Sequence, residues 1–170
     1  MIDTTTGLSP TVEELETWLV QIKEFMEKGI PFNKFLGIRS VHLERGTAHL
    51  LLPFRDELVG NPMVPALHGG TMSALADTAG GAAVFSAINP GDACSTIDLR
   101  IDYLRPAALV DTVAEAELVR LGGRVGVSRI RVWQPRAGVN ESGGAVGPAD
   151  ESGRLQIAEA TGVYAIKRRR

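Results

Sequence analysis

Apolar residues recur three or four positions apart near the N-terminus: Val12, Leu15, Trp18, Leu19, Ile22, Phe25 and Met26. This spacing places them on one face of a helix, so it predicts a packing helix over about Pro10–Lys28. Thr11 and Glu14 have the spacing of a capping box, and Ser9 before a proline is the alternative start. A glycine and a proline follow directly and end the helix.

Alternation of apolar and polar residues is typical of strands, and it predicts six of them. They cover Ile38–Arg45, Ala48–Pro53, Ser95–Leu104, Thr112–Leu121, Arg124–Trp133 and Arg154–Ile166. In Ser95–Leu104 the pattern sets Ile97 and Tyr103 toward the core and Thr96 toward solvent. His42 and His49 have no motif around them, so we expect them to be surface or cross-strand residues.

A different pattern occupies Thr71–Ile88, where alanine, glycine, serine or threonine stands at about every second position. A helix with such small side chains lets other backbone approach closely on every side, as when a sheet wraps around it. Runs of strands with segregated helices predict an α+β domain. We therefore expect an antiparallel sheet, in hairpin succession, curved around this helix.

The candidate chemistry lies in Leu58–Gly91, which holds one charged side chain, Asp77, and one histidine, His68. An isolated carboxylate in apolar surroundings is costly unless something pairs with it or uses it, so Asp77 is a candidate general base or nucleophile. Gly69 and Gly70 open the helix, and glycine leaves the N–H groups of a helix start uncovered. Such groups stabilise negative charge that develops on an oxygen, as in acyl transfer.

Asp77 stands nine residues after His68, so on one helix the two differ by about 180° and by more than two turns. A two-fold dimer would set the helix start of one subunit against the middle of the other helix. The active unit is therefore expected to be a homodimer. No G-x-S-x-G, P-loop or G-x-G-x-x-G motif occurs, which disfavours a serine elbow, nucleotide hydrolysis and dinucleotide redox.

Length and composition fit a single soluble globular domain, with 170 residues and 44% hydrophobic content. The net charge of -2 argues against bulk binding to nucleic acid or to an anionic membrane. One cysteine, Cys94, excludes an intramolecular disulfide, and it has no histidine near it to make it a nucleophile. Neither a signal peptide nor a long apolar run is apparent, so we expect a cytoplasmic protein.

We expect a disordered leader over residues 1–8, one domain over 9–170, and a flexible hairpin loop over 135–153. This loop is rich in glycine, proline and small polar residues. Lys167–Arg170 form a basic tail that a phosphate could bind, but a solvated terminus is the simpler interpretation.

The segment HGGTMSALADTAGGAA, followed by STIDLRIDYLRPA, resembles the hot-dog-fold acyl-CoA thioesterases of the phenylacetate-pathway (PaaI-like) type. The segment PFNKFLGIRSVHLERGTAHLLLP resembles the opening strands of that family, and the likeness covers about Pro31–Trp133 and Gly153–Ile166. It implies a curved antiparallel sheet around one central helix, here with an extra N-terminal helix. It also implies homodimers, commonly homotetramers, and hydrolysis of a thioester to a free acid and coenzyme A without metal or cofactor.

The resemblance also implies roles for single residues. Asp77 looks like the family's catalytic carboxylate, which activates water or attacks the carbonyl. The Gly69 N–H would hold the thioester oxygen, and His68 would orient that turn or touch the thioester. Thr96 matches a position where a hydroxyl holds the attacking water. Asn61 resembles an asparagine that lines the site, although the prolines between it and His68 are unusual.

Gly70 and Thr78 are further candidates for substrate binding. Arg124 and Arg105 could meet the phosphates of coenzyme A, and a solvated surface role is an equal alternative for both. Two other functions stay open here. One is a hot-dog hydratase or dehydratase acting on enoyl or hydroxyacyl thioesters, and the other is a non-catalytic acyl-CoA-binding protein.

Overall fold

The structure is a computed structural model that describes residues 11–63, 65–135 and 150–169. The helical elements are α1 (Val12–Glu24), the π-helical turn η1 (Phe25–Gly29), α2 (Pro31–Leu36), the short 3-10 turn η2 (Asp56–Leu58) and α3 (Gly69–Ala87). The strands are β1 (Arg39–Glu44), β2 (Thr47–Leu52), β3 (Val59–Asn61), β4 (Ala66–Leu67), β5 (Ala93–Tyr103), β6 (Thr112–Leu121), β7 (Val125–Pro135) and β8 (Arg154–Lys167). The predicted leader and most of the predicted 135–153 loop lie outside the described residues.

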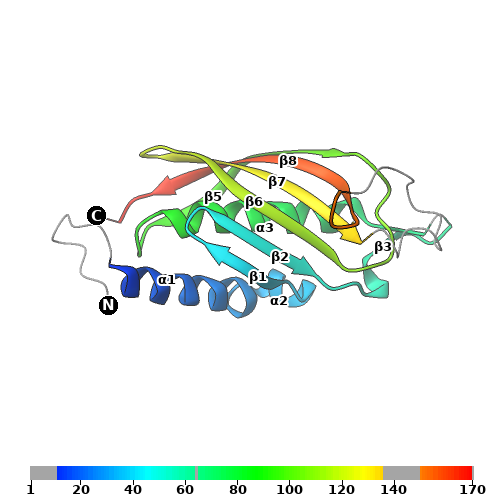
Figure 1. Ribbon diagram of the computed structural model, residues 1–170, viewed down its shortest axis with the longest axis horizontal. Helices are drawn as coiled ribbons and strands as arrows, with labels where there is room; N and C mark the ends of the chain where they lie inside the picture. Colours follow the sequence, from blue (N-terminus) through cyan, green and yellow to red (C-terminus); the bar gives the residue numbers. More distant parts are fainter. Residues whose placement is uncertain (1–10, 64, 136–149, 170) are drawn as a thin grey trace.

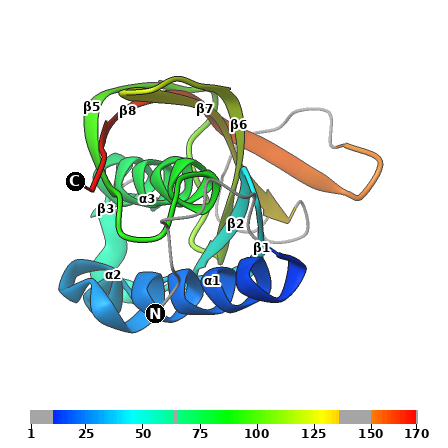
Figure 2. The ribbon, with the colours of Figure 1, turned by 90° about the vertical axis from the view of Figure 1, so that its left-hand side faces the viewer.

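One antiparallel sheet of six strands, in the order β1-β2-β6-β7-β8-β5, curves around α3 (Figure 1). Seen end-on, the strands form an arc over α3, and α1 and α2 run along the open side of that arc (Figure 2). The predicted α+β fold, with a central helix and an extra N-terminal helix, is confirmed. The predicted strands begin and end within two residues of the observed ones.

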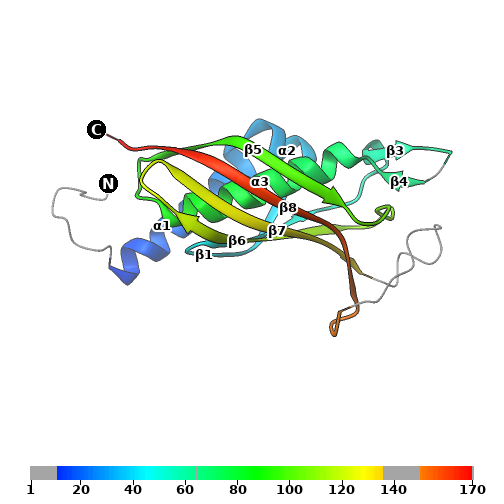
Figure 3. The ribbon, with the colours of Figure 1, turned by 90° about the horizontal axis from the view of Figure 1, so that it is seen from above.

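The strand succession differs from the prediction at one place. β5 pairs with β8 at the far edge of the sheet, whereas β6, which follows β5 in the chain, pairs with β2 (Figure 3). The hairpin prediction was wrong there, because alternation within a strand carries no information about which neighbour the strand takes. The short hairpin of β3 and β4 was not predicted either.

The N-terminal helical segment ends at Gly29, close to the predicted end, but its last turn is irregular. Thr11 caps it in a reciprocal capping box with Glu14, which decides between the two predicted starts. α1 then passes into the π-helical turn, and Pro31 opens α2, a helix that the sequence analysis did not anticipate. Proline at a first helical position starts a helix as readily as it ends one.

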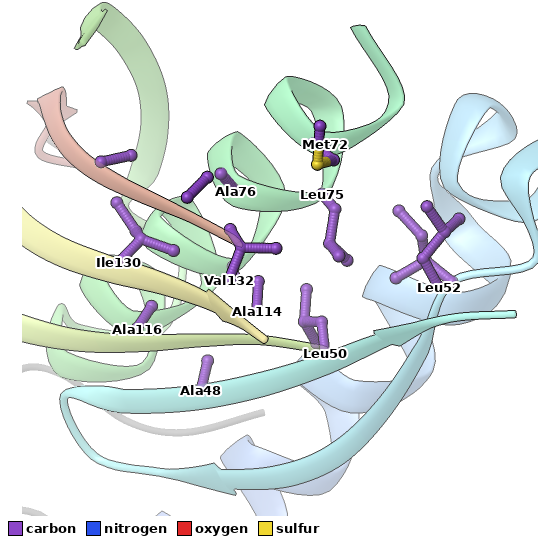
Figure 4. Close-up of a cluster of buried hydrophobic side chains, with 14 of the residues drawn as sticks. Ala48, Leu50, Leu52, Met72, Leu75, Ala76, Ala114, Ala116, Ile130 and Val132 are labelled. Carbon is purple, nitrogen blue, oxygen red and sulfur yellow. The ribbon is translucent and has the colours of Figure 1, made fainter. Parts of the chain in front are cut away.

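The small side chains of α3 allow the sheet to approach the helix closely, as predicted. Alanines of α3 pack against alternate inward residues of β2, β6 and β7 (Figure 4). Gly80 is tighter still, because a Cβ at that position would collide with the hydroxyl of Tyr164 on β8. Burial of these apolar side chains is the main stabilising term of the fold.

The edge strand β5 departs from the alternation that its sequence suggests. A bulge places Ile97 as an extra residue between Thr96, which pairs with Tyr164, and Asp98, which pairs with Val163. The bulge shifts the phase by one residue, so Thr96 turns inward and Ile97 is 58% exposed. The predicted orientation was wrong for both. Tyr103 is 48% exposed, since none of the described strands lies on the outer side of β5.

Two remaining points concern surface residues and membranes. His42 and His49 face each other across β1 and β2, with ring centroids 4.8 Å apart, as the cross-strand interpretation expected. Among the described residues, no helix has the length and apolar character needed to cross a bilayer.

Candidate active site

Asp77 lies in the middle of α3 and faces a cavity of about 490 Å³. Its side chain is half-buried, and Thr96 Oγ1 on β5 donates a hydrogen bond to Asp77 Oδ1 at 2.9 Å. Among the described residues, no cationic side chain lies within ion-pair distance of Asp77. The carboxylate is therefore oriented by a hydroxyl group while its charge stays uncompensated.

The cavity lies between α3, the first half of β5 and the N-terminal helical elements. Its lining residues are Phe25, Met26, Ile30, Phe32, Asn33, Asp77, Thr78, Gly81, Phe85, Asp92, Ala93, Cys94, Ser95, Thr96 and Tyr164. Small-molecule sites typically have volumes of about 300–1,000 Å³ and mostly apolar walls with a few polar groups. This cavity has that character, and α1, predicted only as a packing helix, leads into its wall.

A second polar pair lies next to Asp77. Thr78, a predicted substrate-binding residue, donates its hydroxyl to the Ala74 carbonyl at 2.8 Å and also to Asn33 Oδ1 at 3.3 Å. Asn33 is buried, and its amide donates to the Met26 carbonyl at 3.0 Å. Asn33 was not among the predicted site residues, because it lies in the unpredicted helix α2 and belongs to no motif. Its amide connects the N-terminal helices to α3 beside the carboxylate.

Tyr164 on β8 holds the helix backbone at Asp77. Its buried hydroxyl donates to the Asp77 carbonyl oxygen at 3.0 Å. Burial raises the pKa of the Tyr164 phenol far above its usual range, and the nearby Asp77 charge raises it further. The phenol therefore stays protonated and acts as a fixed hydrogen-bond donor.

Cys94 also lines the cavity. Burial, with a smaller contribution from the Asp77 charge, raises the pKa of the Cys94 thiol to about 11. At neutral pH the thiol is protonated, and a protonated thiol is a weak nucleophile. The geometry thus agrees with the sequence-based view that Cys94 is not the attacking group.

The start of α3 provides the second half of the predicted site. His68 is the N-cap, and its Nδ1 accepts a hydrogen bond from the Gly70 N–H at 2.9 Å. Because Nδ1 is the acceptor, Nε2 is the nitrogen that can carry a proton toward a ligand. No described residue accepts a hydrogen bond from the Gly69 N–H, which is the first N–H of the helix and has no intrahelical acceptor.

Tyr103, at the end of β5, packs against this helix start. Its hydroxyl donates to the Gly69 carbonyl at 3.0 Å and lies 2.6 Å from Ser73 Oγ. The sequence analysis treated Tyr103 only as a core position of a strand, so this contact was missed. The tyrosine fixes the end of β5 to the first turn of α3.

Within one chain, the two halves of the site are separate. Asp77 stands nine positions after His68, which is about 13 Å along the helix axis. Thr96 belongs to the Asp77 half, and Tyr103 belongs to the Gly69 half. The structure therefore brings together Asp77, Thr96 and Thr78, but it does not bring them to His68 and the glycines.

Asn61 is placed near the helix start without facing it. It lies exposed on β3, and its Oδ1 accepts a hydrogen bond from the Met63 N–H at 2.9 Å. The adjacent hairpin residue Gly60 packs directly against the backbone of His68. The predicted role of Asn61 in the site stays a prediction.

Arg105 and Arg124 lie at opposite ends of the sheet. The Arg105 guanidinium donates to the Gln156 carbonyl at 2.6 Å, and its N–H bonds to the Ile157 carbonyl. The Arg124 carbonyl accepts a hydrogen bond from Ile166, which lies nine residues from Ile157 along β8, or about 30 Å. Neither arginine lines the cavity. Their predicted contact with coenzyme A phosphates stays a prediction, and within one chain a single phosphate group cannot touch both.

Lys167, Arg168 and Arg169 are exposed, as the interpretation of a solvated terminus expected, but two of them contact Asp92. Arg168 forms an ion pair with Asp92 at 2.6 Å, and the Arg169 N–H bonds to the same carboxylate at 2.9 Å. Burial raises the pKa of Asp92, but these hydrogen bonds outweigh it and hold the pKa below its ordinary value. Asp92 itself lines the cavity, so Arg168 and Arg169 lie next to the cavity wall.

Several known proteins are similar to this chain in sequence or in structure. Residues 65–139 match the family model of the thioesterase superfamily. The chain is 32% identical over 164 residues, 89% of its length, to the medium/long-chain acyl-CoA thioesterase YigI of Salmonella typhimurium, and it covers 95% of that protein. Among solved structures, a thioesterase family protein from Silicibacter pomeroyi gives a TM-score of 0.74 at 23% identity, covering 88% of this chain and 98% of the other. The E. coli PaaI protein gives 0.69 at 23% identity, covering 89% and 94%.

Proposed function

The chain belongs to the thioesterase superfamily, and from this premise we propose that it hydrolyses acyl-CoA thioesters to a free acid and coenzyme A. The observation that carries the proposal is Asp77, a half-buried carboxylate without an ion-pair partner among the described residues, facing an apolar cavity. The name of the YigI relative, which refers to medium- and long-chain acyl-CoA, supports an aliphatic acyl group.

In the proposed reaction, Asp77 supplies the base or nucleophile. Either it takes a proton from a water molecule that attacks the thioester carbonyl, or it attacks that carbonyl itself and water then releases the acid. Thr96 orients the carboxylate through its hydroxyl. The carbonyl oxygen gains negative charge and the Gly69 N–H donates to it, after which the C–S bond breaks and coenzyme A leaves as a thiolate. On the water route Asp77 passes the proton that it took to this thiolate, and on the covalent route the thiolate takes its proton from water. This chemistry requires no metal or cofactor.

A homodimer would bring the two halves of the site together, and the free edge of β5 indicates how. Thr96, beside Asp77, and Tyr103, beside Gly69, are seven residues apart on this strand. If two copies pair antiparallel about the midpoint between Leu99 and Arg100, Thr96 lies opposite Tyr103 of the other copy. Asp77 of one subunit then faces the helix start of its partner. Pairing of such dimers into tetramers is part of the same proposal.

The activity test measures release of free thiol from a series of acyl-CoA substrates by the full-length protein. We expect Asp77→Ala to lower kcat about 100- to 10,000-fold, the usual contribution of a general acid or base. Asp56→Ala, which removes an exposed carboxylate outside the cavity, should leave kcat unchanged. Full activity of the Asp77 variant would refute its role, and tight binding of acyl-CoA without any hydrolysis would refute the thioesterase proposal.

The dimer is tested by mixing two inactive variants, one at each half of the site. Asp77→Ala provides an intact helix start, and Gly69→Pro provides an intact carboxylate. If the site is shared, half of the randomly mixed dimers are mixed and each holds one intact site, so about a quarter of wild-type activity returns. No recovery after subunit exchange, confirmed by mass, would show that the site does not span two subunits.

A further inference from the structure

The cavity beside Asp77 has an aromatic pair at some distance from the carboxylate, and Asp92, which is ion-paired with Arg168, also lines it. Along α3 its lining runs from Asp77 to Phe85, eight residues or about 12 Å. Thr96 marks the Asp77 end, where its hydroxyl bonds to the carboxylate. At the other end the ring of Phe25 packs against Phe85, with ring centroids 6.2 Å apart. A chain whose carbonyl is held at the Asp77 end would therefore extend toward Phe25.

Phe25 is positioned by an irregular turn of the N-terminal helix (Figure 2, below α3). Between Phe25 and Gly29 the backbone is π-helical, and the Ile30 N–H donates to the Phe25 carbonyl at 3.1 Å, five residues back. The Phe25 ring lies over Gly29, where an added Cβ would be 2.5 Å from Phe25 Cδ2. Single π-helical turns are rare and are frequently found at functional sites.

The exposure of Phe25 separates it from ordinary core residues. Its side chain is 47% exposed and still lines the cavity, so it forms a wall between the cavity and solvent. Phe35 of α2 is similar in type and is 65% exposed, but it does not line the cavity. The chain therefore offers a matched pair of aromatic residues, one at the cavity and one away from it.

We propose that the π-helical turn Phe25–Gly29 sets the acyl-chain length of the substrate, with Phe25 closing the far end of the acyl cavity. This inference rests on the proposed thioesterase function. An extended chain advances about 1.2 Å per bond, because a residue of three bonds spans at most about 3.6 Å. A length of about 12 Å therefore accepts a straight saturated acyl group of about ten carbons, which is a substrate of medium length.

The test is the chain-length profile of kcat/KM for saturated acyl-CoA substrates from four to sixteen carbons. Burying one methylene contributes about 0.8 kcal/mol, and 1.36 kcal/mol is tenfold. For the wild type, kcat/KM should rise about fourfold per carbon up to about ten carbons and then stop rising. Phe25→Ala should continue the rise beyond ten carbons, so that kcat/KM for twelve carbons exceeds that for ten. Phe25→Trp should end the rise at a shorter chain, and Phe35→Ala should keep the wild-type profile.

Gly29→Ala tests the position of the ring without altering the ring itself. Gly29 has no positive φ, so alanine suits the backbone, and only the Phe25 ring must move to make room. We expect the ratio of kcat/KM for ten and four carbons to change by at least about fourfold, the contribution of one methylene. An unchanged ratio would show that Gly29 does not position the ring.

The two proposals fail in different ways. A Phe25→Ala profile that stops at the same length as the wild type overturns the role of the π-helical turn, while hydrolysis itself stands. If the wild type hydrolyses none of the substrates, the proposed function fails instead. In that case the affinity for the same acyl-CoA series, measured by calorimetry, still shows whether Phe25 limits the length of the bound chain.

Discussion

Replacing Gly69 by proline would remove one hydrogen atom that we assign to the oxyanion site and very little else. Gly69 is the first residue of α3, the position where proline is best tolerated in a helix. His68 before it has φ -65° and ψ 130°, the extended conformation that a following proline requires. No intrahelical bond is lost, because the first N–H of a helix has no partner within it.

The space around Gly69 also admits the Cβ of the new residue. The nearest atoms to a Cβ at this position belong to the Tyr103 ring, at 3.4 Å. Proline in a compatible conformation reduces the entropy of the unfolded chain and adds about 0.4–1 kcal/mol of stability. For a chain of this size that is a rise in Tm of about 1–4 °C. The folded protein should therefore be at least as stable as the wild type.

Catalysis should change in the opposite direction. Loss of one oxyanion donor costs about 2.7–4 kcal/mol in the transition state, or about 100- to 1,000-fold in kcat. The neighbouring Gly70 N–H cannot replace it, because it donates to His68 Nδ1 at 2.9 Å. The expected result is thus a variant that is stable and nearly inactive, measured by thermal unfolding and by thiol release under saturating substrate.

Gly69→Ala is the matched control, because it adds the same Cβ and keeps the N–H. We expect it to retain kcat within about tenfold of the wild type, since any loss then comes only from the methyl group near Tyr103. If Gly69→Pro folds and keeps more than about a tenth of the wild-type kcat, the N–H of Gly69 does not hold the oxyanion.

Two further predictions concern the cavity end near β5. Burial alone would raise the pKa of Asp92, but hydrogen bonds from Arg168 and Arg169 hold this pKa below its ordinary value. Ionised Asp92 therefore stabilises the folded protein above the unfolded pKa of about 3.9. This stabilisation is lost as the pH falls through the lower folded pKa. Asp92→Asn should lower the unfolding free energy by about 1–3 kcal/mol at pH 7, and a loss of equal size at pH 2.5 would contradict this origin. For Cys94, burial and the Asp77 charge raise the thiol pKa from 9.0 to about 11, so alkylation at pH 8 should be about 100-fold slower than in urea. Equal rates in the two conditions would contradict the shift.

The sequence was sufficient for the central helix and for the positions of its two candidate site features, the Asp77 carboxylate and the glycines at the helix start. The small side chains of α3 repeat over the whole element, and a pattern of that length is hard to mistake. Asp77 was recognisable because a carboxylate without a cationic neighbour is costly in apolar surroundings. Both properties are local, so they can be inferred from residues close together in the chain.

The missed features depend on contacts between distant segments. The bulge at Ile97 reverses the direction of Thr96, and it exists only relative to the register with β8. Asn33 reaches Thr78 across 45 residues, and Arg168 reaches Asp92 across 76. Alternation, capping and glycine spacing contain no information about such pairs, so sequence reasoning left them unassigned.

The bulge also explains how one strand can serve both halves of the site. In a regular strand, residues seven positions apart point to opposite faces, so Thr96 and Tyr103 could not both contact α3. The extra residue at Ile97 places Thr96 and Tyr103 on the same face of β5. Both hydroxyls then reach α3, that of Thr96 at Asp77 and that of Tyr103 at Gly69. Because the rise of α3 fixes about 13 Å between the two halves, no side-chain rotation within one chain can close that distance. In the proposed dimer, a second β5 edge paired in the opposite direction would bring the two halves together, with Thr96 and Tyr103 already on the face that α3 occupies.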